Sequence, residues 1–260
     1  MIGLIGLDHH STGVELRGRL TFAAERLHAA LSALLSDDTI AEAVILSTCN
    51  RTEIYVAAEE WLPAAATIRR LLAAVCASGA SAIVATVPAA DRQAPGIAPE
   101  SPQALLPPEL DAALYAYEGM EAARHLFRVA GGLRSMVVGE AQILGQVKEA
   151  LAEAEAASSA GDELRPLFTT AIKTGKRVRT ETGIARADVS VAGLTVRVAG
   201  EALGDLRGVS ALLIGAGRTS QLCARLLRDA GAGRLVLANR SPAAAAALAA
   251  EVGGEVIALR

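Results

Sequence analysis

The stretch Val209–Ser220, VSALLIGAGRTS, decides the fold of the second half of the chain. An apolar run typical of a buried strand leads into Gly215-Ala216-Gly217, and a helical pattern follows from Arg218. Two glycines where a strand turns into a helix are typical of a dinucleotide site. The first allows a tight turn, and the second lets a pyrophosphate approach the helix N-terminus. The third glycine of the usual motif is Ser220 here, a small residue that still allows close helix-strand packing.

Strand and helix patterns alternate around this motif. The expected elements are strands over 209–214, 234–238 and 255–259, and helices over 164–179, about 190–202, 218–230 and 242–251. The β-α-β-α-β part is one mononucleotide-binding half of a doubly wound parallel sheet, and it leaves the first strand with an unpaired apolar edge. We therefore expect an incomplete Rossmann-like, NADP-binding domain of α/β class over 163–260.

The end of the second strand of this domain indicates which dinucleotide binds. A domain that binds NAD carries Asp or Glu here, about 20 residues after the glycines, for the ribose 2′-hydroxyl. This chain has a cation between two small hydrogen-bonding side chains instead, which favours a 2′-phosphate. We expect NADPH rather than NADH. The expected cofactor-binding residues are Gly215, Ala216, Gly217, Arg218, Thr219, Ser220, Asn239, Arg240 and Ser241.

The first half of the chain has an α+β pattern. Apolar segments predict buried strands over 2–7, 43–47 and 52–57, and helical periodicity predicts helices over 22–35, 120–129 and 146–157. Residues 78–108 hold six of the nine prolines and predict a long mobile loop. Because Ser158-Ser159-Ala160-Gly161 is typical of a linker, we expect the first domain, of α+β class, to cover 1–162.

Length and composition are those of a globular protein of about two domains, with 260 residues and a net charge of −3. The first residues show no basic run, so we expect no secretory signal, and we expect no membrane span because the longest uncharged stretch, 71–90, is too polar. Three widely spaced cysteines suit neither a disulfide framework nor a zinc site, so we expect a cytoplasmic protein without a metal. The segment from Arg165 to Arg186 contains six Lys or Arg and one Glu. This excess of positive charge suits phosphate contacts as well as a solvated helix face.

Cys49 is the candidate nucleophile. Cys76 and Cys223 lie in apolar helical patterns and are expected to be packed hydrophobes. Cys49 instead lies in a polar turn between two strands, beside Arg51, which could stabilise a thiolate or hold a substrate carboxylate. A thiolate together with a hydride donor suits the reduction of an activated acyl group to an aldehyde through a thioester.

The chain resembles the glutamyl-tRNA reductase family over essentially its whole length. The matching segments are GLDHHSTGVELRGRL (6–20), LSTCNRTEIY (46–55), HLFRVAGGLRSMVVGEAQILGQVKEA (125–150), GKRVRTETGI (175–184), and LLIGAG and ANRS in the nucleotide domain. The resemblance implies NADPH-dependent reduction of glutamyl-tRNA to glutamate-1-semialdehyde, the first step of tetrapyrrole (porphyrin) synthesis. It also implies a glutamate-1-semialdehyde aminomutase as partner, and a homodimer formed through a C-terminal domain that we expect to be absent here.

The resemblance also implies the roles of particular residues in the first domain. Cys49 and His125 are the expected catalytic residues. The expected substrate-binding residues are Thr48, Cys49, Asn50, Arg51, Ser135, Glu140, Ala141, Gln142 and Gln146. Arg134 stands where the family commonly has Asp, and Ala141 where it commonly has Pro. Two other functions stay open: a tRNA-binding regulatory protein without turnover, and a hydrolase that loses its thioester to water when no NADPH is bound.

Overall fold

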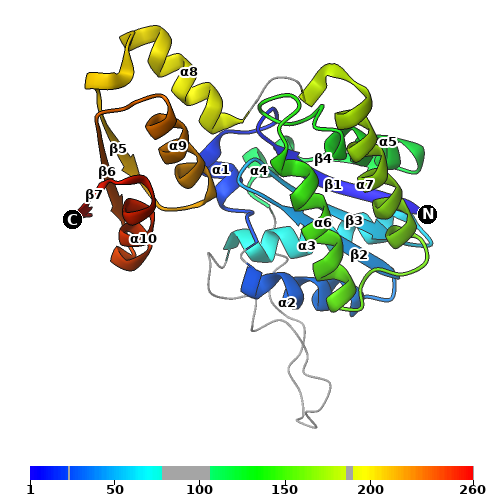
Figure 1. The fold of residues 1–260 in the computed structure, drawn as a ribbon. Coiled ribbons are helices and arrows are strands. Elements are labelled where there is room, and N and C mark those ends of the chain that lie inside the picture. The colour runs from blue at the N-terminus through cyan, green and yellow to red at the C-terminus, as the bar shows by residue number, and fades with distance from the viewer. Residues whose placement is uncertain (23, 78–105, 186–189, 260) are drawn as a thin grey trace. The chain divides into compact units, whose positions relative to one another are not determined.

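The chain forms two compact units, Met1–Ile184 and Ala185–Arg260. The structure, a computed structural model, describes residues 1–22, 24–77, 106–185 and 190–259 (Figure 1). The expected loop 78–108 falls largely outside these ranges, as does Arg186 of the basic segment. Within the described ranges, none of the helices is both long and apolar enough to cross a membrane.

The first unit is built on a four-stranded antiparallel sheet. Its strands are β1 (Ile2–Asp8), β2 (Glu42–Ser47), β3 (Arg51–Ala57) and β4 (Tyr115–Glu118), in the spatial order β2-β3-β1-β4. The predicted β-α-β-β start is confirmed, whereas β4 was not predicted, because four residues of alternating burial carry little periodic signal. β3 is central and buried along its whole length, charged residues included.

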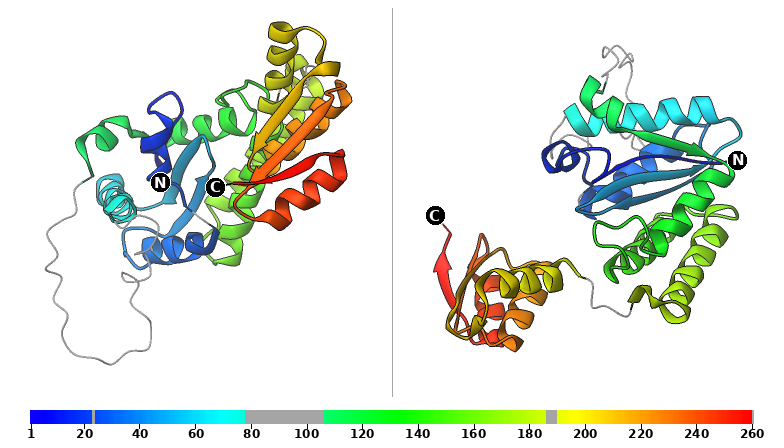
Figure 2. Two further views of the ribbon diagram at one scale, coloured as in Figure 1. Left: turned by 90° about the vertical axis from the view of Figure 1, so that its left-hand side faces the viewer. Right: turned by 90° about the horizontal axis from the view of Figure 1, so that it is seen from above.

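Helices cover both faces of this sheet (Figure 2). They are α1 (Val14–Gly18), α2 (Ala24–Leu35), α3 (Trp61–Ala77), α4 (Pro108–Ala113), α5 (Met120–Ala130), α6 (Gln142–Ala156) and α7 (Leu164–Glu181). Helices α5, α6 and α7 contact one another on one side of the sheet, and α3 packs against β1 on the other. Leucine, isoleucine, valine and alanine side chains from the sheet and helices form one continuous core.

Several helices differ from the sequence prediction. α1 was not predicted, α3 was expected only as an apolar helical pattern around Cys76, and Pro108, expected in the loop, instead starts α4. Pro is tolerated there because the first helical residue needs no hydrogen-bond donor. α6 begins at Gln142, one turn earlier than expected.

Helix α7 belongs to the first unit, so the compact units divide at Ile184/Ala185 rather than at the expected 162/163. The Glu42 carboxylate, on β2, accepts hydrogen bonds from the backbone N–H groups of Gly161, Glu163 and Leu164, at 2.8–3.0 Å. It therefore binds the positive end of α7 to the sheet. Further along α7 the buried Phe168 ring meets Tyr55 edge to face, 5.1 Å between ring centroids.

The second unit is a three-stranded parallel sheet with the Rossmann-like order that the sequence predicts. Its elements are α8 (Val191–Leu203), β5 (Ser210–Ile214), α9 (Arg218–Asp229), β6 (Arg234–Asn239), α10 (Pro242–Val252) and β7 (Glu255–Ala258). β5 lies at one edge of this sheet, and Leu212 and Ile214 on it are 56% and 65% exposed. The expected unpaired apolar edge is thus observed.

Candidate functional site

Cys49 lies at the tip of the tight turn between β2 and β3, with its side chain exposed. The Thr48 N–H donates to the Arg51 carbonyl at 2.8 Å, which closes the turn. The Thr48 hydroxyl accepts from the N–H groups of Asn50 and Arg51, both at 3.1 Å. The hydroxyl that was expected to bind substrate therefore shapes the turn that presents the thiol.

The segment around α1 fixes the same turn from the other side. The Arg17 guanidinium is buried and donates to the Cys49 carbonyl at 3.2 Å and to the Thr12 carbonyl at 2.8 Å. The His9 N–H donates to the Asn50 carbonyl at 3.0 Å. The backbone on both sides of the thiol is thus held by residues far away in the sequence.

A small cavity opens beside the thiol. It is lined by Thr48, Cys49, Asn50, Arg51, Ser135, Met136, Glu140, Ile143 and Gln146. Seven of the expected substrate-binding residues are in this list, whereas Ala141 and Gln142 are not: they form the N-terminus of α6. Ser135 is buried, and within the described part of the chain its hydroxyl has no hydrogen-bond partner. An unsatisfied buried hydroxyl facing a cavity suits a bound polar ligand.

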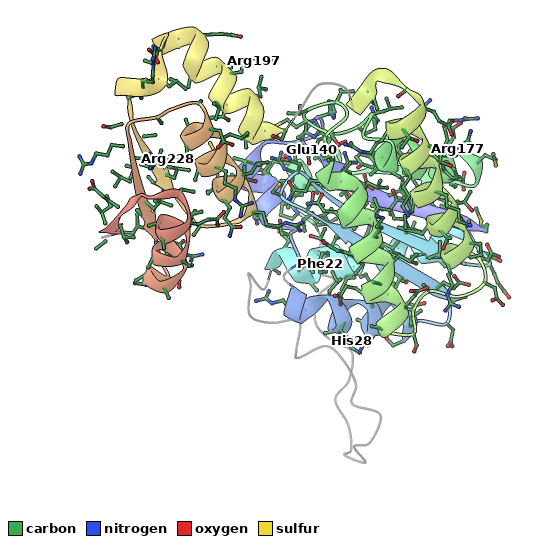
Figure 3. All side chains as sticks on the ribbon, viewed as in Figure 1. Phe22, His28, Glu140, Arg177, Arg197 and Arg228 are labelled. Carbon is green, nitrogen blue, oxygen red and sulfur yellow. The ribbon has the colours of Figure 1, made fainter. Side chains whose placement is uncertain are left out.

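Arg51 and Glu140 bring opposite charges to the cavity walls (Figure 3 labels Glu140). Glu140 is half-buried, and burial raises its pKa, although Arg51 opposes this. Gln146 also lines a second hollow of about 320 Å³, with Phe22 and Glu149 among its other walls.

Behind the cavity, a buried network holds Arg51 in place. Its Nη1 donates to Glu53 Oε1 at 2.6 Å, and its Nη2 donates to the Arg134 carbonyl. Both side chains of the ion pair are at most 1% exposed. The Tyr55 and Tyr115 hydroxyls also donate to the Glu53 carboxylate, each at 2.7 Å. A buried ion pair is tolerated when its remaining donors and acceptors are satisfied in this way.

The charges of this network support one another. Burial would raise the pKa of Glu53, but the Arg51 guanidinium and hydrogen bonds from His125 and Tyr115 hold that pKa well below its usual range. Burial opposes the charge on Arg51, but Glu53 raises the pKa of the guanidinium. Burial and the Glu53 carboxylate raise the pKa of both tyrosines, so their hydroxyls stay protonated as donors.

His125, the second expected catalytic residue, is part of this network and does not line the cavity. It is 3% exposed, and its Nε2 lies 2.8 Å from Glu53 Oε1. Because an ionised carboxylate only accepts hydrogen bonds, Nε2 carries the proton. The Tyr115 and Tyr117 rings lie 5.2 and 5.1 Å from the imidazole, centroid to centroid. His125 therefore reaches the cavity through Glu53 and Arg51.

A glycine makes room for the network. Gly6 on β1 pairs with Glu53 on β3, and a Cβ at position 6 would lie 2.8 Å from the Glu53 Cγ. A side chain here would displace the carboxylate that Arg51, His125 and the tyrosines share.

Helix α7 fixes the loop that carries Glu140. The Arg179 guanidinium donates to the Gly139 carbonyl at 2.8 Å. Gly139 has a φ of +86°, and a Cβ there would lie 2.5 Å from the Ile184 carbonyl oxygen. Only glycine fits this approach, so the Gly139-Glu140 pair is positioned by the end of α7.

The basic segment is only partly available for phosphates. Arg165 pairs with Glu155 at 3.2 Å and Arg177 with Glu181 at 2.9 Å, while Arg179 binds Gly139. Lys173 and Lys176 are exposed on α7, and no ion pair is found for them within the described ranges. These two lysines are the cations of α7 that stay open to a partner.

The second unit has the geometry of a dinucleotide cradle. Gly215 has a φ of +104°, which glycine adopts without strain, and its N–H donates to the Ala238 carbonyl at 2.7 Å. Among the residues that the structure describes, a Cβ at Gly217 would meet nothing within 4 Å, so a ligand can approach the backbone there. Gly217 precedes α9 without a side-chain cap, which leaves the helix N-terminus open to an anion. The Arg240 side chain is exposed after β6.

Sequence reasoning missed Arg17, Glu53 and Tyr115 as residues of this site. Glu53 stands in the quoted segment LSTCNRTEIY, where a charged residue inside a buried strand is the one signal that could have singled it out. Arg17 and Tyr115 carry no such local signal, because their partners lie 32 and 62 residues away.

Comparisons with known proteins agree with this division of the chain. The family model described as glutamyl-tRNA(Glu) reductase, N-terminal domain, matches residues 5–182, and the model described as shikimate/quinate 5-dehydrogenase matches residues 197–260. Two curated relatives are a glutamyl-tRNA reductase of Rubrobacter xylanophilus, 41% identical over 98% of this chain and 53% of its own length, and a glutamyl-tRNA reductase 2 of Anaeromyxobacter dehalogenans, 40% identical over 96% and 48%.

A solved structure is also similar. The glutamyl-tRNA reductase of Methanopyrus kandleri matches with a TM-score of 0.59 at 29% identity, over 99% of this chain and 54% of the solved chain. The chain thus spans about half the length of the relatives it matches.

Proposed function

Because the chain belongs to the glutamyl-tRNA reductase family, we propose that it takes part in the NADPH-dependent reduction of glutamyl-tRNA to glutamate-1-semialdehyde, the first step of tetrapyrrole synthesis. The observation that carries this proposal is the exposed Cys49 thiol at the tip of a rigid turn, beside a cavity with one cationic and one acidic wall. The relatives bear the name of this reaction.

The first step proposed for Cys49 is acyl transfer. The thiol gives up its proton to solvent, and the thiolate attacks the ester carbonyl that links glutamate to the tRNA. The S–C bond forms, the C–O bond to the terminal ribose breaks, and the leaving ribose oxygen takes a proton from solvent. The turn fixed by Arg17 and Thr48 holds the nucleophile in one place, which lowers the entropy cost of attack.

The lining of the cavity offers a partner for each charged group of the glutamyl residue. Glutamate esterified through its α-carboxyl keeps a free ammonium and a free side-chain carboxylate. We assign the carboxylate to Arg51, whose planar guanidinium has five N–H donors, of which two serve Glu53 and Arg134. The ammonium is assigned to Glu140, and the unsatisfied Ser135 hydroxyl to a ligand oxygen.

His125 is proposed to act through Glu53. Its Nε2–H and the two tyrosine hydroxyls bind the carboxylate that holds Arg51. Loss of the imidazole would leave Glu53 with one hydrogen-bond donor fewer and let the Arg51 guanidinium move. Substrate affinity would then fall more than the rate of bond breaking. His125 is in this proposal a positioning residue.

The residues after β5 and β6 fit an NADP-type dinucleotide. The open backbone at Gly217 and the uncapped N-terminus of α9 suit a pyrophosphate, and the exposed Arg240 suits a 2′-phosphate. When bound, NADPH would supply the hydride that converts the thioester to the aldehyde and frees the Cys49 thiol.

Arg240→Ala tests the choice of cofactor. We expect NADPH binding to weaken about tenfold or more, because a charge-assisted contact to the 2′-phosphate is lost, while NADH binding stays nearly unchanged. Fluorescence titration of the reduced nucleotides measures both. Arg197→Ala, which removes another exposed arginine of the same unit, is the control. Equal losses of NADPH and NADH would contradict the assignment.

Lys173 and Lys176 are the proposed phosphate contacts for the tRNA. Replacing both by alanine should lower the slope of log affinity against log salt by about one to two, because each contact releases a counterion. Filter binding of tRNA over a range of salt concentrations measures the slope, with Lys148→Ala on α6 as control. An unchanged slope would remove α7 from the tRNA-binding surface.

Single-turnover mixing with glutamyl-tRNA, with and without NADPH, separates the proposed reaction from the two alternatives. Semialdehyde formed only with NADPH supports the reductase. Free glutamate as the sole product supports a thioester hydrolase, and tRNA binding without either product supports a regulatory tRNA-binding protein. The proposal has three further parts. The reaction takes place in the cytoplasm, an aminomutase takes up the reactive aldehyde, and the protein assembles as a homodimer.

A further inference from the structure

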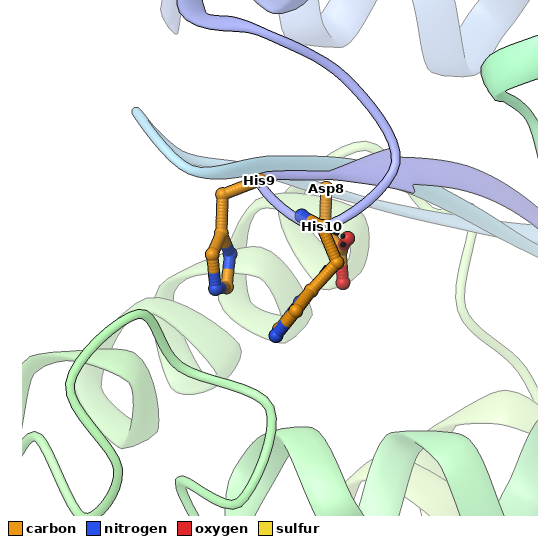
Figure 4. Close-up of side chains that lie close together, drawn as sticks. All are labelled: Asp8, His9 and His10. Carbon is orange, nitrogen blue, oxygen red and sulfur yellow. Dashed lines mark hydrogen bonds and ion pairs between the residues drawn. The ribbon is translucent and has the colours of Figure 1, made fainter.

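Three consecutive residues at the end of β1 present metal-ligand atoms to one another. Asp8, His9 and His10 each offer one such atom, and these atoms all lie within 4.8 Å of one another. Figure 4 shows the two imidazole rings and the carboxylate close together on the turn that follows the strand. The expectation of no metal rested on cysteine spacing and did not consider this cluster.

Two of the ligand-type atoms in this cluster lack a partner. Asp8 is 2% exposed, and no hydrogen bond is found for its Oδ2 in the part of the chain that the structure describes. The same holds for His9 Nδ1, which is also shielded from solvent. Buried polar atoms in folded proteins are nearly always satisfied, so these two atoms indicate a bound group.

The spacing suits a metal ion. A tetrahedral zinc site has bonds of about 2.0–2.2 Å to nitrogen and oxygen, so its ligands stand about 3.3–3.5 Å apart. His10 Nδ1 lies 3.5 Å from Asp8 Oδ1, a separation that matches two ligands of one ion. The two imidazole centroids are 3.9 Å apart, closer than the about 5 Å that a shared tetrahedral ion requires, and side-chain rotation of the exposed His10 can separate the rings.

We propose that Asp8, His9 and His10 bind one divalent transition-metal ion, with solvent in the remaining positions. Two imidazoles and one carboxylate form a donor set that suits zinc and its neighbours and disfavours calcium and magnesium, which require oxygen ligands. None of the three residues lines the cavity beside Cys49, and no step of the proposed reaction uses the ion.

The fold holds two of the three ligands in advance. Asp8 pairs in register with Arg51 across the sheet, and its N–H donates to the Ser11 hydroxyl at 3.0 Å. The His9 backbone is bound to the Asn50 carbonyl. A bound ion would therefore stiffen the connection between the start of the chain and the turn that carries Cys49.

Metal titration of the whole chain tests the site. Cys49 and Cys223 are replaced by serine so that thiols do not bind the probe, and Zn²⁺ and Co²⁺ are added in calorimetric and absorption titrations. We expect one equivalent to bind with an affinity on the order of micromolar. His10→Ala, at an exposed position that does not support the fold, should weaken binding about tenfold or more. Asp8→Asn should do the same.

His28→Ala is the matched control, because His28 is an exposed histidine on α2 outside the cluster. The His28→Ala variant should bind the ion with the same affinity as the chain without that substitution. Circular dichroism shows whether each variant keeps its fold. If Asp8→Asn does not fold, His10→Ala still tests the site. Unchanged binding by a folded His10→Ala variant, or no binding up to about 1 mM, would overturn the proposal.

Discussion

Replacement of Cys49 by serine is expected to abolish semialdehyde formation, with a loss on the order of 10³-fold or more. A serine hydroxyl at the same position is far less ionised and less nucleophilic than a thiol, and no base that could activate it lines the described cavity apart from the half-buried Glu140. Rapid mixing with glutamyl-tRNA and NADPH, with the aldehyde trapped, measures the effect. Binding of the tRNA should be nearly unchanged, because the turn keeps its backbone contacts to Arg17 and Thr48.

Cys223→Ser is the matched control for this experiment. Cys223 is also a free cysteine, but it lies on α9, and burial raises the pKa of its thiol. Its replacement should leave the single-turnover rate within about twofold. Aldehyde formed at the normal rate by Cys49→Ser would refute the thioester route altogether.

Replacement of Glu53 by glutamine is expected to destabilise the first unit by about 3–5 kcal/mol. The amide fills the same space as the carboxylate but leaves the Arg51 guanidinium, 1% exposed, without a counter-charge. It also turns one of two acceptor oxygens into a donor that faces protein donors. Urea denaturation, followed by circular dichroism, measures the free energy of unfolding.

The same substitution changes how stability depends on pH. The pKa of Glu53 is depressed in the folded chain, so its contribution is present above the ordinary carboxyl pKa of about 4.3 and is lost as pH falls toward the folded value. Wild-type stability should therefore fall below about pH 4 more steeply than that of Glu53→Gln. Glu59→Gln, at an exposed position just after β3, should change neither stability nor its pH dependence. A variant as stable as the wild type at neutral pH would show that the ion pair is not what holds Arg51.

The elements that repeat a local pattern were predictable. The glycine motif, the alternating strands and helices of the second unit and the β-α-β-β start of the first were all expected and are observed. Cys49 was expected in a turn between two strands and lies in one. The short strand β4 and helix α4 were not predicted, because four to six residues hold too little periodicity to separate them from loop.

The site depends on contacts that local sequence patterns do not predict. His125 was expected to be a catalytic residue, and its imidazole binds Glu53, 72 residues away in the sequence. Thr48, expected on the substrate, lines the cavity and also shapes the turn. α7 was expected to start the second domain, but Glu42 and Phe168 bind it to the first. The contacts of His125 and of α7 depend on partners that no neighbouring residue identifies.

The sequence alone determined the class of both folds, the dinucleotide motif and the position of the candidate thiol, because periodicity and turn chemistry depend on residues that are near neighbours in the chain. Only the tertiary structure decided which charges are buried together. Antiparallel pairing places Gly6 opposite Glu53, and α5 then brings His125 to the same carboxylate. A charge leaves water only where distant segments supply its counter-charge and hydrogen bonds, and that condition is met by packing rather than by sequence spacing.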